Sequence, residues 1–173
     1  MARAPRVDLR TFQQELATRL ATKTTAQVES SRLGLSTGTE RWLVRLADAG
    51  EVIAMPAIVK VPMTRDWFLG VANIRGALYG VTDFGAFLGR PLTVRGPENR
   101  LLLIGQPHGV NCALLVARLA GLRNVVEYAA ESAAEPRTPW SANAWRDGDA
   151  KLWRELDTQK LLTQQEFLEI AVH

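Results

Sequence analysis

Short apolar segments separated by turn-forming residues are the feature that most constrains this chain. From about residue 33 onward, segments of strand length alternate with glycine, aspartate, asparagine or proline at intervals of about ten residues. Consecutive antiparallel strands need only short connections, whereas parallel strands need long crossovers. The pattern therefore predicts an all-β fold of barrel type with little helix between the strands.

The individual strands follow from the positions of the turn residues. In chain order we expect strands at Leu33–Thr37, Glu40–Leu46, Val52–Met55, Ile58–Val61, Val71–Arg75, Ala77–Thr82, Arg100–Ile104, Val110–Val116 and Asn124–Tyr128. Gly38 and Gly76 each lie between two neighbouring strands and predict hairpins. The segments Val52–Met55 and Ile58–Val61 suggest a further pair, and the proline that follows each of them marks a strand end.

An amphipathic helix is expected near the N-terminus, with Asp8 as its cap. Its apolar positions are spaced at three, four and four residues and are Leu9, Phe12, Leu16 and Leu20. The polar stretch Thr22–Ser31 is expected to be a linker. We therefore divide the chain into a helix with its linker over residues 1–32 and a β-rich body over residues 33–173.

A few other segments of the body are expected to lie outside its strands. Asp83 can cap a short helix that runs through Leu88, and Leu156–Leu162 is also short and helical in character. The small, acidic and proline-containing segment Ala129–Pro139 is expected to be an exposed loop. For the final apolar stretch, Phe167–Val172, helix and strand both remain open because periodicity cannot separate them over so few residues.

Composition excludes several classes of protein. With 47% hydrophobic residues the chain is not expected to be disordered. Its longest strongly apolar stretch is Leu101–Ile104, whereas a membrane span needs roughly 20 such residues. No secretory signal is visible among the first 20 residues, and the single cysteine, Cys112, has no partner for a disulfide. We therefore expect a soluble, cytoplasmic protein.

The residues that usually carry catalysis are scarce. The two histidines are His108, in a Pro-His-Gly turn, and His173, and the thiol of Cys112 lies in an apolar run typical of a core strand. No Gly-Lys pair completes a phosphate-binding loop. The acidic residues Asp147, Asp149, Glu155 and Asp157 do not have the spacing of a calcium loop. We therefore expect no enzyme activity, no cofactor and no metal.

Nucleic-acid binding is the alternative function that the fold class raises, because small β-barrels often bind single strands through basic grooves with stacking aromatic residues. The chain has 21 basic and 18 acidic residues, so its formal net charge is only +3. The basic residues are scattered, and most tryptophans lie beside apolar residues. We therefore expect no nucleic-acid partner, and this function is kept only as the alternative.

One segment carries a specific resemblance. It reads Gly70-Val71-Ala72-Asn73-Ile74-Arg75-Gly76, followed by Val81-Thr82-Asp83-Phe84 and then by Phe87-Leu88-Gly89. This closely resembles the signature of CheW-like domains, and Gly50-Glu51-Val52-Ile53 resembles an upstream element of that family. The resemblance covers about residues 33–172. Within the family, the chain looks most like the PilI-type members of chemosensory systems that govern twitching motility by type IV pili.

The resemblance implies both a fold and a role. The fold would be two small, packed, SH3-like barrels of five strands each. The role would be a non-catalytic adaptor that joins the regulatory domain of a CheA-type histidine kinase to the cytoplasmic tip of a methyl-accepting receptor. Such a protein would be associated with receptor arrays at the membrane without inserting into it.

The resemblance also selects candidate partner-binding residues. Arg75 is the first of these, because a guanidinium at the edge of an apolar patch is a common interface anchor. The full set expected to contact partners is Arg75, Gly76, Asn73, Val71, Gly70, Asp83 and Glu51.

Overall fold

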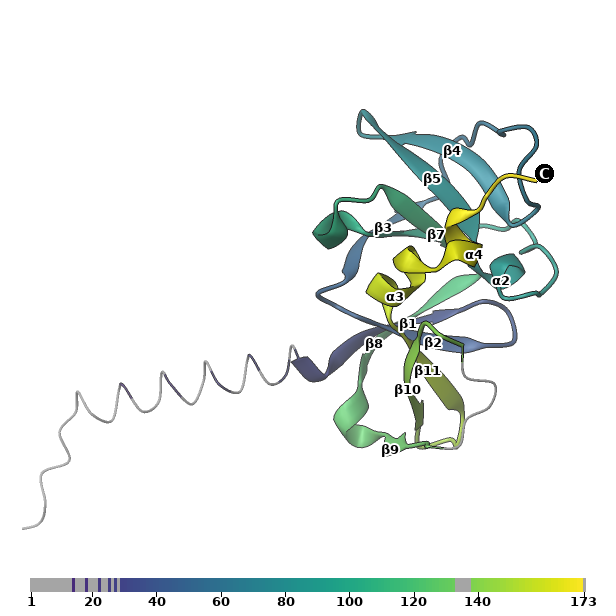
Figure 1. Cartoon of the computed structure of the whole chain (residues 1–173). Coiled ribbons are helices and arrows are strands. Elements are labelled where there is room, and N and C mark those ends of the chain that lie inside the picture. The colour runs from purple at the N-terminus through teal and green to yellow at the C-terminus, as the bar shows by residue number, and fades with distance from the viewer. Residues whose placement is uncertain are drawn as a thin grey trace, which may run out of the picture.

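The structure is a computed structural model. It describes residues 29–132 and 138–172 and, nearer the N-terminus, residues 14, 18, 22, 25 and 27. Figure 1 shows two small β structures stacked on one another, with short helices packed beside them. The all-β fold with two barrels, predicted from the sequence and from the family resemblance, is confirmed.

The first sheet is built from both ends of the described chain, and we call it the terminal barrel. Its order is β8-β1-β2-β11-β10-β9, with β2 and β11 parallel and every other pair antiparallel. Its strands are β1 (Ser31–Ser36), β2 (Arg41–Arg45), β8 (Arg118–Asn124), β9 (Ala129–Ala130), β10 (Ser141–Arg146) and β11 (Leu152–Leu156). This sheet has six strands rather than the expected five, because two residues of the predicted loop Ala129–Pro139 pair with β10 as β9.

The second sheet is inserted between β2 and β8 in the sequence, and we call it the middle barrel. Its order is β3-β6-β7-β5-β4, and only β5 and β7 are parallel. Its strands are β3 (Ala49–Ala54), β4 (Phe68–Ile74), β5 (Ala77–Asp83), β6 (Arg100–Ile104) and β7 (Cys112–Val116). The hairpin predicted around Gly76 is confirmed as β4–β5, as the one around Gly38 is confirmed as β1–β2.

Two strand predictions are wrong. Strand β3 pairs with β6 and not with the segment Ile58–Val61, which forms only a single bridge between Val59 and Val71 of β4. The predicted strand Asn124–Tyr128 is instead a 3-10 turn, η2 (Val125–Glu127), because the Asn124 side chain accepts a hydrogen bond from the Val126 amide and ends β8.

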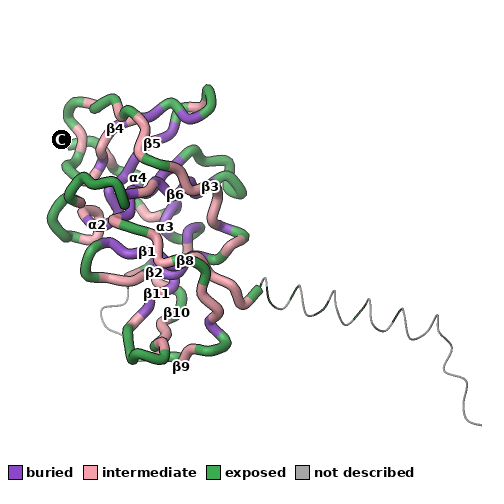
Figure 2. Tube along the Cα trace, turned by 180° about the vertical axis from the view of Figure 1, so that it is seen from behind, coloured by how far each residue is buried: buried purple, intermediate pink, exposed green. Residues whose placement is uncertain are grey.

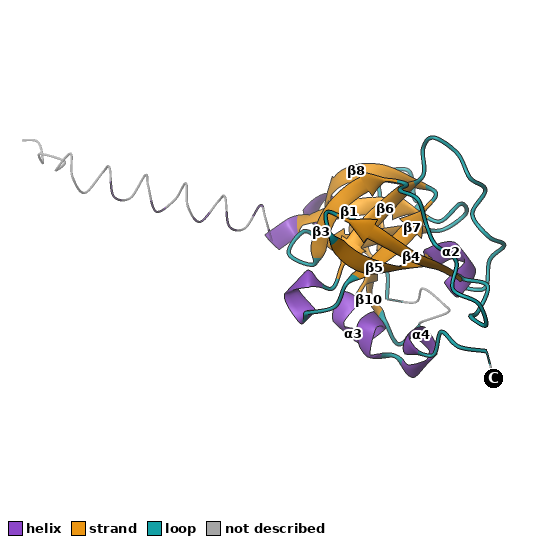
Figure 3. Cartoon of the chain, turned by 90° about the horizontal axis from the view of Figure 1, so that it is seen from above, coloured by secondary structure: helices purple, strands orange, loops and turns teal. Residues whose placement is uncertain are grey.

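Short helices connect and cover the barrels. They are α2 (Phe84–Phe87), the 3-10 turn η1 (Gln106–His108), α3 (Thr158–Thr163) and α4 (Gln165–Leu168). Asp83 caps α2 as predicted, and Asp157 caps α3. The undecided segment Phe167–Val172 contains both kinds of structure, since it ends α4 and then places Ala171 in an antiparallel bridge with Thr64. Figure 3 shows α3 and α4 together on one side of the strands.

The two barrels share one core. Its buried residues come from β1 and β2 on one side and from α2, β6 and β7 on the other, and they include Leu35, Trp42, Val44, Phe84, Leu102, Ile104, Leu114 and Val116. An aromatic group extends this core, because Phe87 of α2 lies 5.1 Å from the rings of both Trp140 and Phe167. Figure 2 shows buried segments along the strands and where the barrels meet, with exposed loops around them.

The predicted N-terminal helix lies mostly outside the described residues. This applies to its cap, Asp8, and to its whole apolar stripe of Leu9, Phe12, Leu16 and Leu20. The described residues between 14 and 30 are all helical, and Ser31 begins β1. The polar stretch Thr22–Ser31, expected to be a linker, is helical at its described positions through Ser30.

Candidate functional site

Arg75 lies in the two-residue turn between β4 and β5, which form the hairpin labelled in Figure 1. Ile74 pairs with Ala77, and the two residues between them, Arg75 and Gly76, have φ values of 52° and 85°. A two-residue turn with both φ values positive matches the twist of the strands and favours Asn-Gly. Placing an arginine in this left-handed conformation lowers the stability of the fold by roughly 1 kcal/mol. Asparagine at this position would be less strained.

Neighbouring polar groups hold this tip in place. The Asn73 side-chain oxygen accepts a hydrogen bond of 2.9 Å from the Gly76 amide. Arg75 Nη2 lies 2.5 Å from Glu51 Oε1, and their side chains are 76% and 40% exposed. Because this pair is so exposed, it contributes little to stability. It joins β3, which carries Glu51, to the turn between β4 and β5, and it orients a guanidinium that still faces solvent.

Gly70 acts within the fold, because it allows a second segment to approach β4. A Cβ atom at Gly70 would lie 2.1 Å from the carbonyl oxygen of Val59, and the φ value of Gly70 is 126°. The amides of Val59 and Val71 each donate to the carbonyl of the other residue, at 2.8 and 2.9 Å. Any larger side chain at Gly70 would therefore displace Val59 from the edge of β4.

The outer side of this hairpin combines apolar and polar side chains. Val59 and Val71 are bridge partners and so project from the same side of the sheet, and Asn73 pairs with Leu78 on the next rung. Val59 is 68% exposed and Leu78 is 61% exposed. Large apolar side chains exposed on one side of a sheet are a feature of interaction surfaces. We define the hairpin face as Val59, Val71, Asn73, Arg75 and Leu78.

The structure thus brings most of the predicted residues to one place. Arg75, Gly76, Asn73 and Glu51 surround the hairpin tip, and Val71 lies on the same face. Val59 and Leu78 were missed by sequence reasoning. The sequence could have predicted that Leu78 is exposed. In the predicted strand Ala77–Thr82, Leu78 lies on the opposite face from Tyr79 and Val81, which are buried. Val59 could not have been predicted, because its place beside Val71 comes from a long-range bridge.

Asp83 lies at the opposite end of β5 and is only 1% exposed. Its Oδ1 accepts hydrogen bonds from the Ala86 amide at 3.2 Å and from the Thr93 hydroxyl at 2.9 Å. Its Oδ2 accepts a bond of 2.7 Å from the Thr93 amide. The carboxylate therefore caps α2 and anchors the loop that follows, and its burial removes it from any contact surface. We correct its predicted role from partner binding to structural.

The residues considered for chemistry are dispersed. Cys112 is buried in β7, and burial raises the pKa of its thiol to about 12, so it is not a nucleophile at neutral pH. His108 lies on the exposed turn η1. Glu155 is buried and paired with Arg32, whereas Asp157 caps α3. Among the described residues, no group of three or more His, Cys, Asp or Glu side chains is placed to hold a metal ion.

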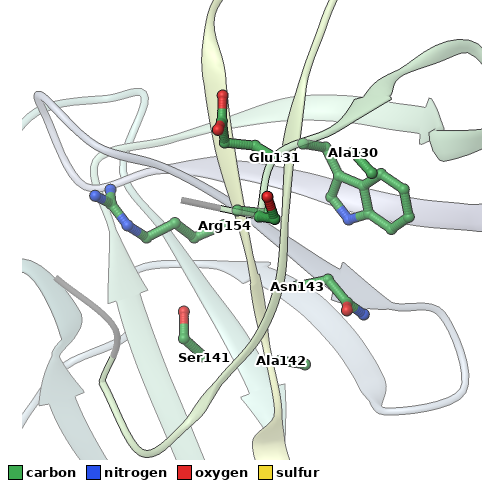
Figure 4. Close-up of a pocket in the computed structure, with 9 residues that line it drawn as sticks. Ala130, Glu131, Ser141, Ala142, Asn143 and Arg154 are labelled. Atoms are coloured by element: carbon green, nitrogen blue, oxygen red, sulfur yellow. The ribbon is translucent and has the colours of Figure 1, made fainter. Parts of the chain in front are cut away.

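A hollow of about 310 Å³ lies between β9, β10 and β11. Figure 4 shows Glu131, Asn143 and Arg154 pointing in different directions around it, and much of the remaining wall is alanine. Polar groups that do not converge cannot act together on one substrate atom. In the part of the chain that the structure describes, no helix has the length and apolar character needed to cross a membrane.

Comparison with known proteins identifies the family. The family model for the CheW-like domain matches residues 32–166. The chain belongs to the CheW-like domain family. The family predicted from the Gly70–Gly76 motif is therefore confirmed. Membership of this family supports the coarse role of a scaffold or adaptor.

Two similar proteins refine this picture. The CheW-like chain is 30% identical over 110 residues to Protein PilI of Pseudomonas aeruginosa, and the match covers 61% of each protein. The chain thus matches about three fifths of the length of that relative. The crystal structure of the scaffolding protein TtCheW from Thermoanaerobacter tengcongensis superimposes with a TM-score of 0.63, at 18% identity, over 74% of this chain and 88% of that one. This likeness establishes the shared fold.

Proposed function

We propose that this CheW-like protein couples methyl-accepting chemoreceptors to a CheA-type histidine kinase, without catalysis, in a pathway that controls type IV pilus twitching motility. The family and the similarity to PilI support this role. The hairpin face is proposed as a contact surface for these partners, and Arg75 is proposed as its anchor.

The single observation that carries the proposal is the conformation of Arg75. The hairpin turn accepts a left-handed arginine where asparagine would cost less, and the ion pair with Glu51 is too exposed to repay that cost. Backbone strain kept at an exposed tip is typical of functional positions. The guanidinium retains donors that can form forked hydrogen bonds with a partner, and the same hairpin face includes the exposed apolar side chains of Val59 and Leu78.

The test replaces Arg75 by asparagine. Because Asn-Gly is the preferred pair for this turn, we expect Arg75→Asn to leave the free energy of unfolding unchanged or to raise it by up to about 1 kcal/mol. Affinity for the kinase regulatory domain or for a receptor cytoplasmic fragment should fall at least about tenfold, as for the loss of one interface anchor. Calorimetric titration and thermal melting measure both quantities.

Arg90→Asn provides the matched control. Arg90 is also an exposed arginine paired with a glutamate, Glu40, at 2.7 Å, but it lies outside the hairpin face. It should leave both affinities unchanged. Equal affinities of wild type and Arg75→Asn for both partners would overturn the proposed role of this face.

A further inference from the structure

A groove of about 640 Å³ lies beside the first half of β4, at the end away from the Arg75 tip. One wall is the loop from Lys60 to Asp66, another is the start of β4, and the third is the segment after α2 that contains Leu92 and Arg95. This groove shares no lining residue with the hairpin face or with the hollow beside β10, although Lys60 directly follows Val59 of the hairpin face.

Apolar side chains form part of the interior and part of the rim of the groove. Phe68 is 7% exposed and Leu69 is half-buried, whereas Met63 and Leu92 are 80% and 52% exposed. A single exposed apolar residue needs no explanation, but here two of them, Met63 and Leu92, line the same hollow as the buried Phe68 and the half-buried Leu69. Methionine at a rim adapts to the shape of different ligands. The groove therefore has the apolar character of a docking site.

The groove also carries an excess of positive charge. Lys60, Arg65 and Arg95 line it together with one acidic residue, Asp66. Within the described ranges, no carboxylate forms an ion pair with any of these three cations, although Arg45, Arg75, Arg90 and Arg146 all have one. Arg65 donates instead to the Glu169 carbonyl at 3.0 Å, and Arg95 Nη1 lies 3.8 Å from the Met55 sulfur. Three cations against one carboxylate leave the lining with a formal excess of two positive charges.

The C-terminal segment holds one wall of the groove in position. The Arg65 amide donates to the Ile170 carbonyl at 2.8 Å, and the Val172 amide donates to the Met63 carbonyl at 2.9 Å. These bonds surround the bridge between Thr64 and Ala171. The loop that carries Met63 is thus fixed by backbone pairing, and a ligand would not have to order it on binding.

We propose that this groove binds an acidic, apolar peptide segment of a partner protein. Leucine- or phenylalanine-like side chains of that peptide pack on Phe68, Leu69 and Met63, and its carboxylates face Lys60 and Arg95. The cations border a hollow with an apolar floor rather than a flat surface, which favours a peptide over a membrane. The proposal adds a second recognition surface to the chain and does not depend on the role of the hairpin face.

Two labelled peptides provide the first test. Both carry leucine at the same positions, and the remaining positions are glutamate in one and lysine in the other. Fluorescence anisotropy with the full chain should show saturable binding of the glutamate peptide, weakened by added salt, and little binding of the lysine peptide. Equal affinity for the two peptides would overturn the proposal, as would binding to phosphatidylserine vesicles without binding to the glutamate peptide.

Variants locate the binding. Lys60→Glu combined with Arg95→Glu should weaken the glutamate peptide at least about tenfold. Arg118→Glu, at an exposed position of β8, is the matched control and should have no comparable effect. Arg75→Asn should also leave this affinity unchanged, which separates the groove from the hairpin face. If the double variant keeps its melting temperature and still binds the peptide as wild type does, the groove is not the site.

Discussion

The two barrels have similar topology but different interiors. The middle barrel encloses eight buried residues, nearly all aliphatic, namely Ala72, Ile74, Tyr79, Val81, Leu101, Leu103, Ala113 and Leu115. The corresponding cluster of the terminal barrel has three buried residues, Leu43, Val125 and Trp153. The Arg123 guanidinium lies over the Trp153 ring, 5.2 Å from its centroid. The terminal barrel therefore has less apolar packing of its own.

Polar contacts supplement the packing of the terminal barrel. Arg32 Nε and Glu155 Oε1 are 2.5 Å apart, with side chains only 12% and 4% exposed, and Asn143 donates to the other carboxylate oxygen at 2.6 Å. Trp153 Nε1 donates to Asp147 at 2.8 Å. The barrel that presents the hairpin face thus depends on dispersion and hydrophobic burial, whereas the other depends in part on paired charges.

The largest effect is expected from truncating the aliphatic interior. Leu115→Ala should lower the free energy of unfolding by about 4 kcal/mol, because the removed methyl groups leave a cavity among close-packed neighbours. Leu43→Ala in the terminal barrel removes the same atoms from a residue that is also 0% exposed, and it should cost about 2 kcal/mol. Urea denaturation followed by tryptophan fluorescence gives both values. A larger loss for Leu43→Ala would reverse the comparison.

The next effect concerns the buried ion pair. Glu155→Ala leaves the mostly buried Arg32 charge without its partner and should lower the free energy of unfolding by about 3 kcal/mol. The double change Arg32→Met with Glu155→Leu removes both charges and should recover most of that loss. Urea denaturation of the single and double variants measures the difference. If the double variant is as unstable as Glu155→Ala, the pair matters through its shape rather than its charges.

The smallest expected effect is on the loss of stability at low pH, to which Asp147 contributes. Burial alone would raise the pKa of Asp147, but hydrogen bonds from Trp153 and from the Lys151 and Asp149 amides, with the Lys151 charge, lower its pKa below the usual value of 3.8. A carboxyl whose pKa is lower in the folded state stabilises the fold above its unfolded pKa, and this contribution disappears as the pH falls through the folded pKa. Asp147→Asn should therefore reduce the loss of stability below about pH 4. Melting curves across this pH range, compared with Asp149→Asn, provide the measurement.

Local signals in the sequence predicted the local structure. The hairpins around Gly38 and Gly76 and the cap at Asp83 each depend on residues a few positions apart, so turn chemistry was sufficient. The pairing of β3 with β6 joins residues about 50 positions apart, and no local pattern distinguishes it from pairing with Ile58–Val61. The sixth strand of the terminal barrel, β9, was missed because its two residues, Ala129 and Ala130, show no alternation of apolar and polar side chains.

The residues of the candidate site were likewise predictable only where a local motif contained them. Its motif located Arg75, Asn73 and Val71, whereas Val59 joins them only through a bridge that Gly70 makes possible. Asp83 belongs to the same motif but is buried. An aspartate at the end of a strand can cap a following helix as readily as it can contact a partner, and Asp83 caps α2. A motif identifies residues that belong together in sequence, and burial decides which of them a partner can touch.

The insertion of one barrel within the other has a consequence for synthesis on the ribosome. All five strands of the middle barrel have been made once Val116 emerges, but the terminal barrel lacks β11 until Leu156, about 40 residues later. At typical translation speeds this interval lasts several seconds, which is longer than most small domains need to fold. The middle barrel can therefore fold first, and β1 and β2 can then pack against it. Strand β11, which is made later, completes the terminal barrel by pairing with β2.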